Sequence, residues 1–161
     1  MSMDESNEPH WTVDRPNVLV VACSDGRLQE VTDAFLSHNL GITRYDRFYA
    51  PGGAGALSAT GRDFSRARRM REECHYLIDL HRITRAILLF HGPAADGPAE
   101  AVCADYRRKL PYAAASALRD RQNEDAHELL KTAQEWAGDA VVDFYRCEVD
   151  RHGFATFVGL D

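Results

Sequence analysis

The stretch that most constrains this fold runs from Asn17 to Arg27 and reads NVLVVACSDGR. It opens with an uninterrupted apolar run at residues 18–21. A continuous apolar run, unlike an alternating one, is typical of a strand buried on both faces of a parallel sheet. In such sheets the residues just beyond the carboxyl end of a strand lie in the crevice where ligands bind. The sequence therefore predicts an α/β fold with candidate functional residues directly after this strand.

Three chemically capable side chains follow the strand at alternate positions: Cys23, Asp25 and Arg27. A cysteine thiolate is a soft metal ligand or a nucleophile. The Arg27 guanidinium could pair with Asp25 and keep that carboxylate ionised and oriented. The same residues could instead be structural, with Ser24 or Asp25 capping the next helix and Cys23 filling the core. The residues alone leave both interpretations open.

A second expected strand begins at Arg85, continues as an apolar run at residues 86–90 and ends in His91. His91 thus occupies the same topological position as Cys23, at the carboxyl end of a buried strand. If the two strands are neighbours, as right-handed βαβ winding allows, the two side chains can converge. A lone histidine at a strand end is usually a hydrogen-bonded structural group, so the pairing with Cys23 is what indicates a site.

Helical and strand patterns alternate along the rest of the chain. Helices are expected over residues 28–38, 57–81, 99–110 and 113–138, and strands over 46–50, 140–149 and 154–158. The last two strands flank a DRHG turn and should form a β-hairpin. The pattern predicts a three-layer domain with a mostly parallel sheet of four or five strands, helices on its faces and a C-terminal hairpin.

Length and charge restrict the class of protein. The 161 residues suit an N-terminal arm, residues 1–15, and one domain, residues 16–161. Trp11 in this arm is too large an apolar group to stay exposed without a docking site.

A net charge of −6 argues against nucleic acid and anionic membranes as partners. With no membrane-length apolar run and a polar, acidic start, the protein is expected to be cytoplasmic.

The remaining cysteines are Cys74, Cys103 and Cys147. They form no CxxC pair, which argues against a disulfide framework and against a self-contained zinc finger. Reduced thiols are therefore expected. All three lie on segments whose apolar pattern predicts core positions, so they are interpreted as core residues.

Several of these features together resemble the β-class carbonic anhydrases. They are the CSDGR motif at 23–27, the small-residue loop at 51–55, a helix containing Tyr76, and the strand ending in His91. The resemblance implies a carbonate dehydratase-like lyase that reversibly hydrates carbon dioxide to bicarbonate, with zinc as cofactor and a small-molecule substrate. It also implies a homodimer or higher homo-oligomer, because the active site of that family lies at a subunit interface.

The resemblance also assigns roles to four residues. Cys23 and His91 match two zinc ligands, and Asp25 and Arg27 match a catalytic dyad beside the metal. Zinc lowers the pKa of bound water toward neutrality. The dyad carboxylate would accept a hydrogen bond from the attacking hydroxide and orient it toward carbon dioxide.

The chain departs from the family pattern at one ligand. The family places a cysteine three residues after the histidine, and here that position is Ala94, which cannot bind a metal. Catalytic zinc commonly has three protein ligands plus water, so the site is expected to be incomplete. Asp25 or Asp96 could supply a carboxylate, a harder ligand that would lower the affinity or change the metal preference.

Two other functions remain open on the sequence. One is an inactive or repurposed carbonic anhydrase fold that binds a small anion through Arg27 and the loop at 51–55. The other is a thiol-based enzyme in which Cys23 is the nucleophile and His91 the base, acting on a small carbonyl or thiocarbonyl substrate.

Overall fold

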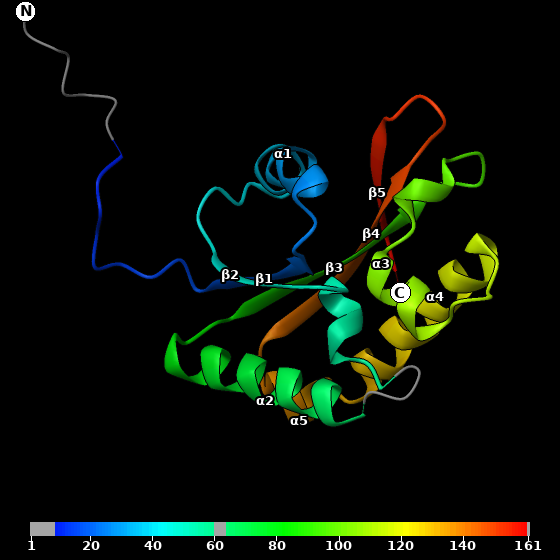
Figure 1. Ribbon diagram of the computed structural model, residues 1–161. Coiled ribbons are helices and arrows are strands. Elements are labelled where there is room, and N and C mark those ends of the chain that lie inside the picture. Colours follow the sequence, from blue (N-terminus) through cyan, green and yellow to red (C-terminus); the bar gives the residue numbers. More distant parts are fainter. Residues whose placement is uncertain (1–8, 60–63, 161) are drawn as a thin grey trace, which may run out of the picture.

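The computed structural model describes residues 9–59 and 64–160. Its centre is a five-stranded sheet in the order β2-β1-β3-β4-β5 (Figure 1). The strands are β1 (Val18–Cys23), β2 (Asp46–Ala50), β3 (Arg85–Pro93), β4 (Val141–Val149) and β5 (Ala155–Gly159). The pairs β1–β2, β1–β3 and β3–β4 are parallel, and β5 runs antiparallel to β4 as the second strand of a hairpin. The predicted mostly parallel sheet with a C-terminal hairpin is confirmed.

Within residues 9–59 and 64–160, five α-helices and three short 3-10 segments surround the sheet. They are α1 (Gln29–Leu40), α2 (Phe64–Leu80), α3 (Ala104–Lys109), α4 (Ala115–Lys131), α5 (Ala133–Ala137), η2 (Gly26–Leu28), η3 (Gly53–Leu57) and η4 (Ala99–Ala101). Two predicted helices were too long: 99–110 is divided into η4 and α3, and 113–138 is divided at Thr132. Leu57, the expected start of a long helix, belongs to η3, and residues 60–63 of that prediction lie outside the described residues.

The continuous apolar run in β1 is explained by helices on both faces of the sheet. Leu19 and Val21 belong to the core cluster that includes residues of α2, α4 and α5. Val20 belongs to the opposite cluster, which contains Phe35 and Leu36 of α1. Neighbouring side chains of a strand point to opposite faces, so a strand covered on both sides needs apolar residues throughout. The three-layer arrangement predicted from the sequence is confirmed.

Strands β1 and β3 are direct neighbours, with Val18 opposite Arg85 and Val21 opposite Leu88. Because the pair is parallel, both carboxyl ends lie at one edge of the sheet (Figure 1). This arrangement brings the residues that follow β1 close to those that end β3.

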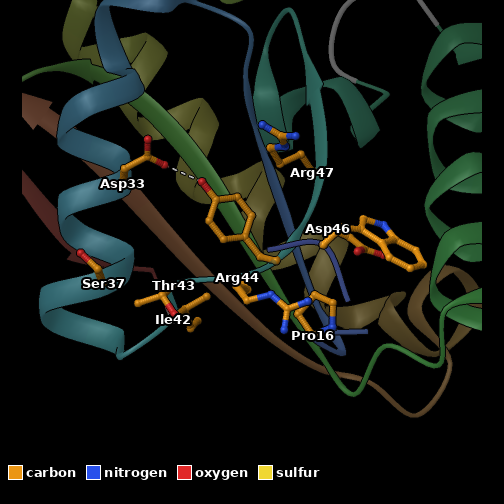
Figure 2. Close-up of a pocket in the computed structure, with 10 residues that line it drawn as sticks. Pro16, Asp33, Ser37, Ile42, Thr43, Arg44, Asp46 and Arg47 are labelled. Carbon is orange, nitrogen blue, oxygen red and sulfur yellow. Dashed lines mark hydrogen bonds between the residues drawn. The ribbon is translucent and has the colours of Figure 1, made fainter. Parts of the chain in front are cut away.

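The arm meets α1 and β2 at a hollow of about 740 Å³, shown in Figure 2. Arg44 fixes the arm here by donating a hydrogen bond to the Asp14 carbonyl at 2.9 Å. Trp11 lines the hollow but remains 87% exposed. The docking site expected for this side chain is therefore not supplied by the described residues of the same chain.

No helix within residues 9–59 and 64–160 combines the length and the apolar character that crossing a bilayer requires.

Gly53 lies where residues 51–57, which contain η3 and are called the η3 loop below, pass against the ends of β1 and β3. Its φ is +55°, and a Cβ there would lie 2.6 Å from the Leu89 carbonyl oxygen and 2.7 Å from the Cys23 nitrogen. These are backbone atoms of the sheet, which cannot rotate away. We expect Gly53→Ala to lower the free energy of unfolding by about 3 kcal/mol, measured by urea denaturation.

Gly41→Ala is the matched control for this prediction. Gly41 also has a positive φ, +67°, but no described atom lies within 4 Å of its would-be Cβ. Only the backbone preference is lost there, so about 1 kcal/mol is expected. If both variants lose the same free energy of unfolding, the close approach at Gly53 does not contribute to the effect of its substitution.

Candidate metal centre

Three potential metal ligands meet at the carboxyl ends of β1 and β3. They are the Cys23 sulfur, a ring nitrogen of His91 and the Cys103 sulfur, which all lie within 4.8 Å of one another. The sequence predicts that Cys23 and His91 converge, and the structure places them together. Their role as ligands remains a prediction.

Cys103 has a second feature, besides its core position, that the sequence pattern does not reveal. It is buried, with 2% exposure, as a core position should be, but its sulfur also faces Cys23 and His91. The predicted core position is confirmed, but the proximity to Cys23 and His91 is not foreseen, because the apolar spacing over residues 99–110 matches one continuous helix and no such helix passes through this position. Cys103 is instead the extended residue that precedes α3, with a φ of −58° and a ψ of 121°.

Neither the position of the missing family cysteine nor the carboxylates considered in its place belong to this cluster. The Ala94 nitrogen donates to the Val149 carbonyl at 2.8 Å, in the turn after β3. Asp96 is exposed, with its carboxylate 3.7 Å from the Arg151 guanidinium. Asp25 is engaged by Arg27. Within the described part of the chain, the third potential ligand beside Cys23 and His91 is a thiol and not either carboxylate.

The chemistry of the three donors fits zinc. His91 is only 3% exposed, and its Nε2 atom has no hydrogen-bond partner among the described residues. Leaving a buried polar atom unpaired is costly, and a metal ion would satisfy it. Two sulfurs and one imidazole are soft to borderline donors suited to zinc, and three protein ligands leave a fourth position for water.

A hydrogen bond between the two thiols in the cluster shifts the pKa of each in opposite directions. The hydrogen bond from Cys103 lowers the pKa of Cys23 to about 4; burial opposes this shift and the His91 ring assists it. The same hydrogen bond, together with burial, raises the pKa of Cys103. Burial raises the pKa values of Cys74 and Cys147 to about 12. Cys23 is therefore the thiol poised to be a thiolate at neutral pH.

Asp25 and Arg27 form the predicted pair. The Nη2 of Arg27 donates a hydrogen bond to the Oδ2 of Asp25 at 2.6 Å. The Nε of Arg27 donates to the Oδ1 of Asp25 at 3.0 Å. Asp25 also accepts from the Arg27 backbone nitrogen at 3.0 Å and so caps η2, which means that the capping role holds as well. The Arg27 Nη1 donates to the Glu100 carbonyl at 3.1 Å and ties the dyad to η4.

The pKa of Asp25 reports on this pair. The side-chain hydrogen bonds from Arg27 lower the pKa of Asp25 to about 2 from an ordinary 3.8, although partial burial raises it. We expect Arg27→Met to raise this pKa part of the way to 3.8, as followed by carboxyl ¹³C NMR.

The sign of the accompanying stability change follows from this depressed pKa. The contribution of Asp25 to stability is present above about pH 4 and is lost as the pH falls toward about 2. Arg27→Met should therefore flatten the dependence of melting temperature on pH in that window. Arg85→Met, which breaks the pair with Asp143 at the amino end of β3, is the control. An unchanged Asp25 pKa in the Arg27 variant would contradict the pairing.

Two hollows give small molecules access to the dyad. One, of about 190 Å³, is lined by Asp25 and His91 and by apolar residues that include Leu28, Val31 and Val149. The other, of about 240 Å³, extends from Cys23 and Asp25 to the β2 edge. A small reactant can therefore approach Asp25 and His91 beside an apolar wall.

Comparisons with known proteins agree with this architecture. No family model and no curated protein matches the chain. A carbonic anhydrase from Streptococcus mutans has a similar structure, with a TM-score of 0.50 and 15% identity over 96% of this chain and 87% of that one. The β-carbonic anhydrase isoform I of Trichomonas vaginalis has a TM-score of 0.47 and 12% identity, covering 95% of this chain and 88% of that chain. The β-carbonic anhydrase CafA of Aspergillus fumigatus has a TM-score of 0.46 and 17% identity, covering 89% and 76%.

At such low identity the likeness concerns the fold alone. The predicted carbonic anhydrase-like α/β fold is confirmed.

Proposed function

We propose that this protein is a zinc-dependent, carbonic anhydrase-like enzyme that reversibly hydrates carbon dioxide to bicarbonate. Cys23, His91 and Cys103 would hold the metal, and Asp25 and Arg27 would form the dyad beside it. The observation that carries the proposal is the meeting of three donors that suit zinc, two sulfurs and a ring nitrogen of His91, whose buried Nε2 has no hydrogen-bond partner among the described residues. The resemblance in sequence and the shared fold support the same reaction class.

Each residue has a definite task in this reaction. Zinc, when bound, would supply a Lewis acid that brings the pKa of a water molecule toward neutrality. Cys23 and Cys103 would bind as thiolates and His91 as a neutral imidazole. Asp25, held ionised by Arg27, would accept a hydrogen bond from the attacking water and orient its lone pair. The apolar wall beside it would receive carbon dioxide and limit access of bulk water.

The test combines metal content with activity. Protein purified without chelator should contain about one zinc per chain by elemental analysis, because three protein ligands suffice for a catalytic site. It should accelerate carbon dioxide hydration in a stopped-flow assay, and removal of the metal by a chelator should abolish that activity. Zinc far below one per chain after reconstitution, with hydration at the buffer rate, would refute the proposal.

A thiol-based enzyme is a second candidate, favoured by the Cys23 pKa of about 4 and the adjacent His91. Alkylation by iodoacetamide at neutral pH separates the two. In the zinc enzyme the metal should protect Cys23, and stripping it should expose the thiolate. A thiol enzyme would be alkylated and inactivated at the same rate with and without zinc. The anion-binding alternative gains no support from the loop at 51–55, because Gly53 packs against Cys23.

We also propose a homodimer in which a second copy covers the β2 edge and receives Trp11. The open side of this edge strand and the 87% exposure of Trp11 beside the hollow support this arrangement. Sedimentation velocity should show a dimer that Trp11→Ala weakens, whereas a monomer at all concentrations would contradict it.

The four free thiols support a cytoplasmic location.

A further inference from the structure

Cys103 is held differently from the other two donors. Cys23 and His91 belong to paired strands, whereas Cys103 directly precedes α3, which spans only Ala104–Lys109. A helix this short has little stability of its own. The position of the Cys103 sulfur therefore depends on contacts that fix α3 to the rest of the molecule.

Asp105, two residues beyond Cys103, makes several of these contacts. Its side chain is 3% exposed and lies 3.2 Å from the Arg66 Nη1, 3.1 Å from the Arg108 Nη2 and 3.3 Å from the Lys109 Nζ. The side chain of Lys109 is also 3% exposed. A buried carboxylate surrounded by three cations is strongly held, and the loss of its charge would leave those cations facing one another.

The same cations reach the η3 loop. The Arg66 Nη2 donates to the Pro51 carbonyl at 2.6 Å, and the Lys109 Nζ donates to the Gly55 carbonyl at 2.9 Å. Asp105 itself touches this loop, because a Cβ on Gly52 would lie 2.5 Å from its Oδ2. Asp105 thus joins α3 to the loop directly and through two cations.

The loop in turn contacts Cys23. The would-be Cβ of Gly53 lies 2.7 Å from the Cys23 nitrogen, and Gly53 is buried. A continuous chain of contacts therefore runs from the Cys23 backbone through Gly53 and Gly52 to Asp105, and then two residues back to Cys103.

We propose that Asp105 is a positioning residue that sets the separation between the Cys23 and Cys103 sulfurs by clamping α3 to the η3 loop. For the metal, this inference rests on the proposed zinc site. For the two thiols it does not, because their separation is a property of the metal-free chain. The two parts are therefore tested separately.

The metal-free test measures the effective concentration of the two thiols. In glutathione buffers one oxidised glutathione is consumed and two reduced glutathiones are released for each Cys23–Cys103 disulfide formed. Peptide mapping identifies the pair. We expect Asp105→Asn to lower the effective concentration at least about tenfold, since it depends on how closely the thiols are held. Asp143→Asn, which removes a carboxylate from the Arg85 pair at the opposite end of β3, should leave it unchanged.

The metal test uses zinc and cobalt(II). Loss of a residue that orients a ligand typically weakens binding about 10- to 100-fold, so this loss of zinc affinity is expected for Asp105→Asn. The sulfur-to-cobalt charge-transfer absorption should fall toward about half, because one of two thiolates is misplaced. A residue important only for overall stability would lower the melting temperature without changing this spectrum.

The outcomes separate the two proposals. Wild-type thiols with a high effective concentration but no zinc binding would refute the zinc enzyme and leave the role of Asp105 standing. Unchanged effective concentration and cobalt spectrum in Asp105→Asn would overturn the positioning role. If Asp105→Asn does not fold, Arg66→Gln, which removes one cation of the cluster and its bond to Pro51, should show the same changes at smaller size. Wild-type behaviour in that variant would also overturn the inference.

Discussion

Replacement of Cys103 by serine is expected to weaken zinc binding at least about 100-fold. This loss exceeds the effect of removing a residue that only orients a metal ligand. Cys103 supplies one of the three donors that lie within 4.8 Å of one another. A serine hydroxyl is not ionised at neutral pH and cannot replace a thiolate at the metal. Competition with a chromophoric chelator measures the affinity, and elemental analysis measures the metal retained after purification.

Two other buried thiols provide matched controls for this variant. Cys74 and Cys147 are buried like Cys103, but they are not part of the three-donor cluster. Cys74→Ser and Cys147→Ser should keep the wild-type zinc affinity even where they lower stability. If Cys103→Ser also keeps it, the third ligand lies elsewhere, and Asp25 or Asp96 becomes the residue to replace next.

Asp25→Asn is expected to lower kcat/KM for carbon dioxide hydration by about 10²- to 10⁴-fold, the usual range for a positioned proton acceptor. The amide keeps the size of the side chain but loses the charge that accepts a hydrogen bond from the attacking water. Zinc content should remain at the wild-type level, because Asp25 lies outside the three-donor cluster and is paired with Arg27. Stopped-flow kinetics and elemental analysis on the same sample test both statements.

Asp96→Asn is the control for this second variant. Asp96 is an exposed carboxylate on the loop after β3, 3.7 Å from Arg151, so its loss should change neither rate nor metal content. If Asp25→Asn loses zinc together with activity, then Asp25 is a metal ligand and not a group that orients water. Full activity with zinc bound would remove Asp25 from the mechanism.

The central part of the fold is predictable because its signals are local. The runs at residues 18–21 and 86–90 are apolar on both strand faces, and the structure covers both faces with helices. Parallel neighbours necessarily share a carboxyl edge, which places Cys23 beside His91. The pairing of Asp25 with Arg27 is similarly local, because the two residues are separated by one position.

The position of Cys103 is not predictable in this way because long-range contacts determine it. The apolar spacing over residues 99–110 matches one helix, but the chain turns between η4 and α3. Arg27 holds the Glu100 carbonyl on one side of this turn, and the Tyr106 hydroxyl donates to Asp125 at 2.6 Å on the other. None of these contacts has a signal in local periodicity.

The family resemblance identifies two of the three clustered donors but not the third. It identifies Cys23 and His91 as a pair, and the structure brings them together. Its expected spacing points to Ala94, and so it directs attention to carboxylates and away from a cysteine on a different element. A search for any third soft donor, without a required spacing, would have kept Cys103 as a candidate.

The three donors come from two strands and from the residue that precedes α3, and this has a consequence for the unfolded chain. An ion bridging Cys23 and Cys103 would close a long loop of polypeptide, and the entropy lost by a tethered unfolded chain grows with loop length. Metal uptake would therefore raise the heat resistance of the protein as well as equip it for chemistry. In a cell short of zinc, the protein would have a lower thermal stability and would be degraded faster, in addition to lacking the proposed activity.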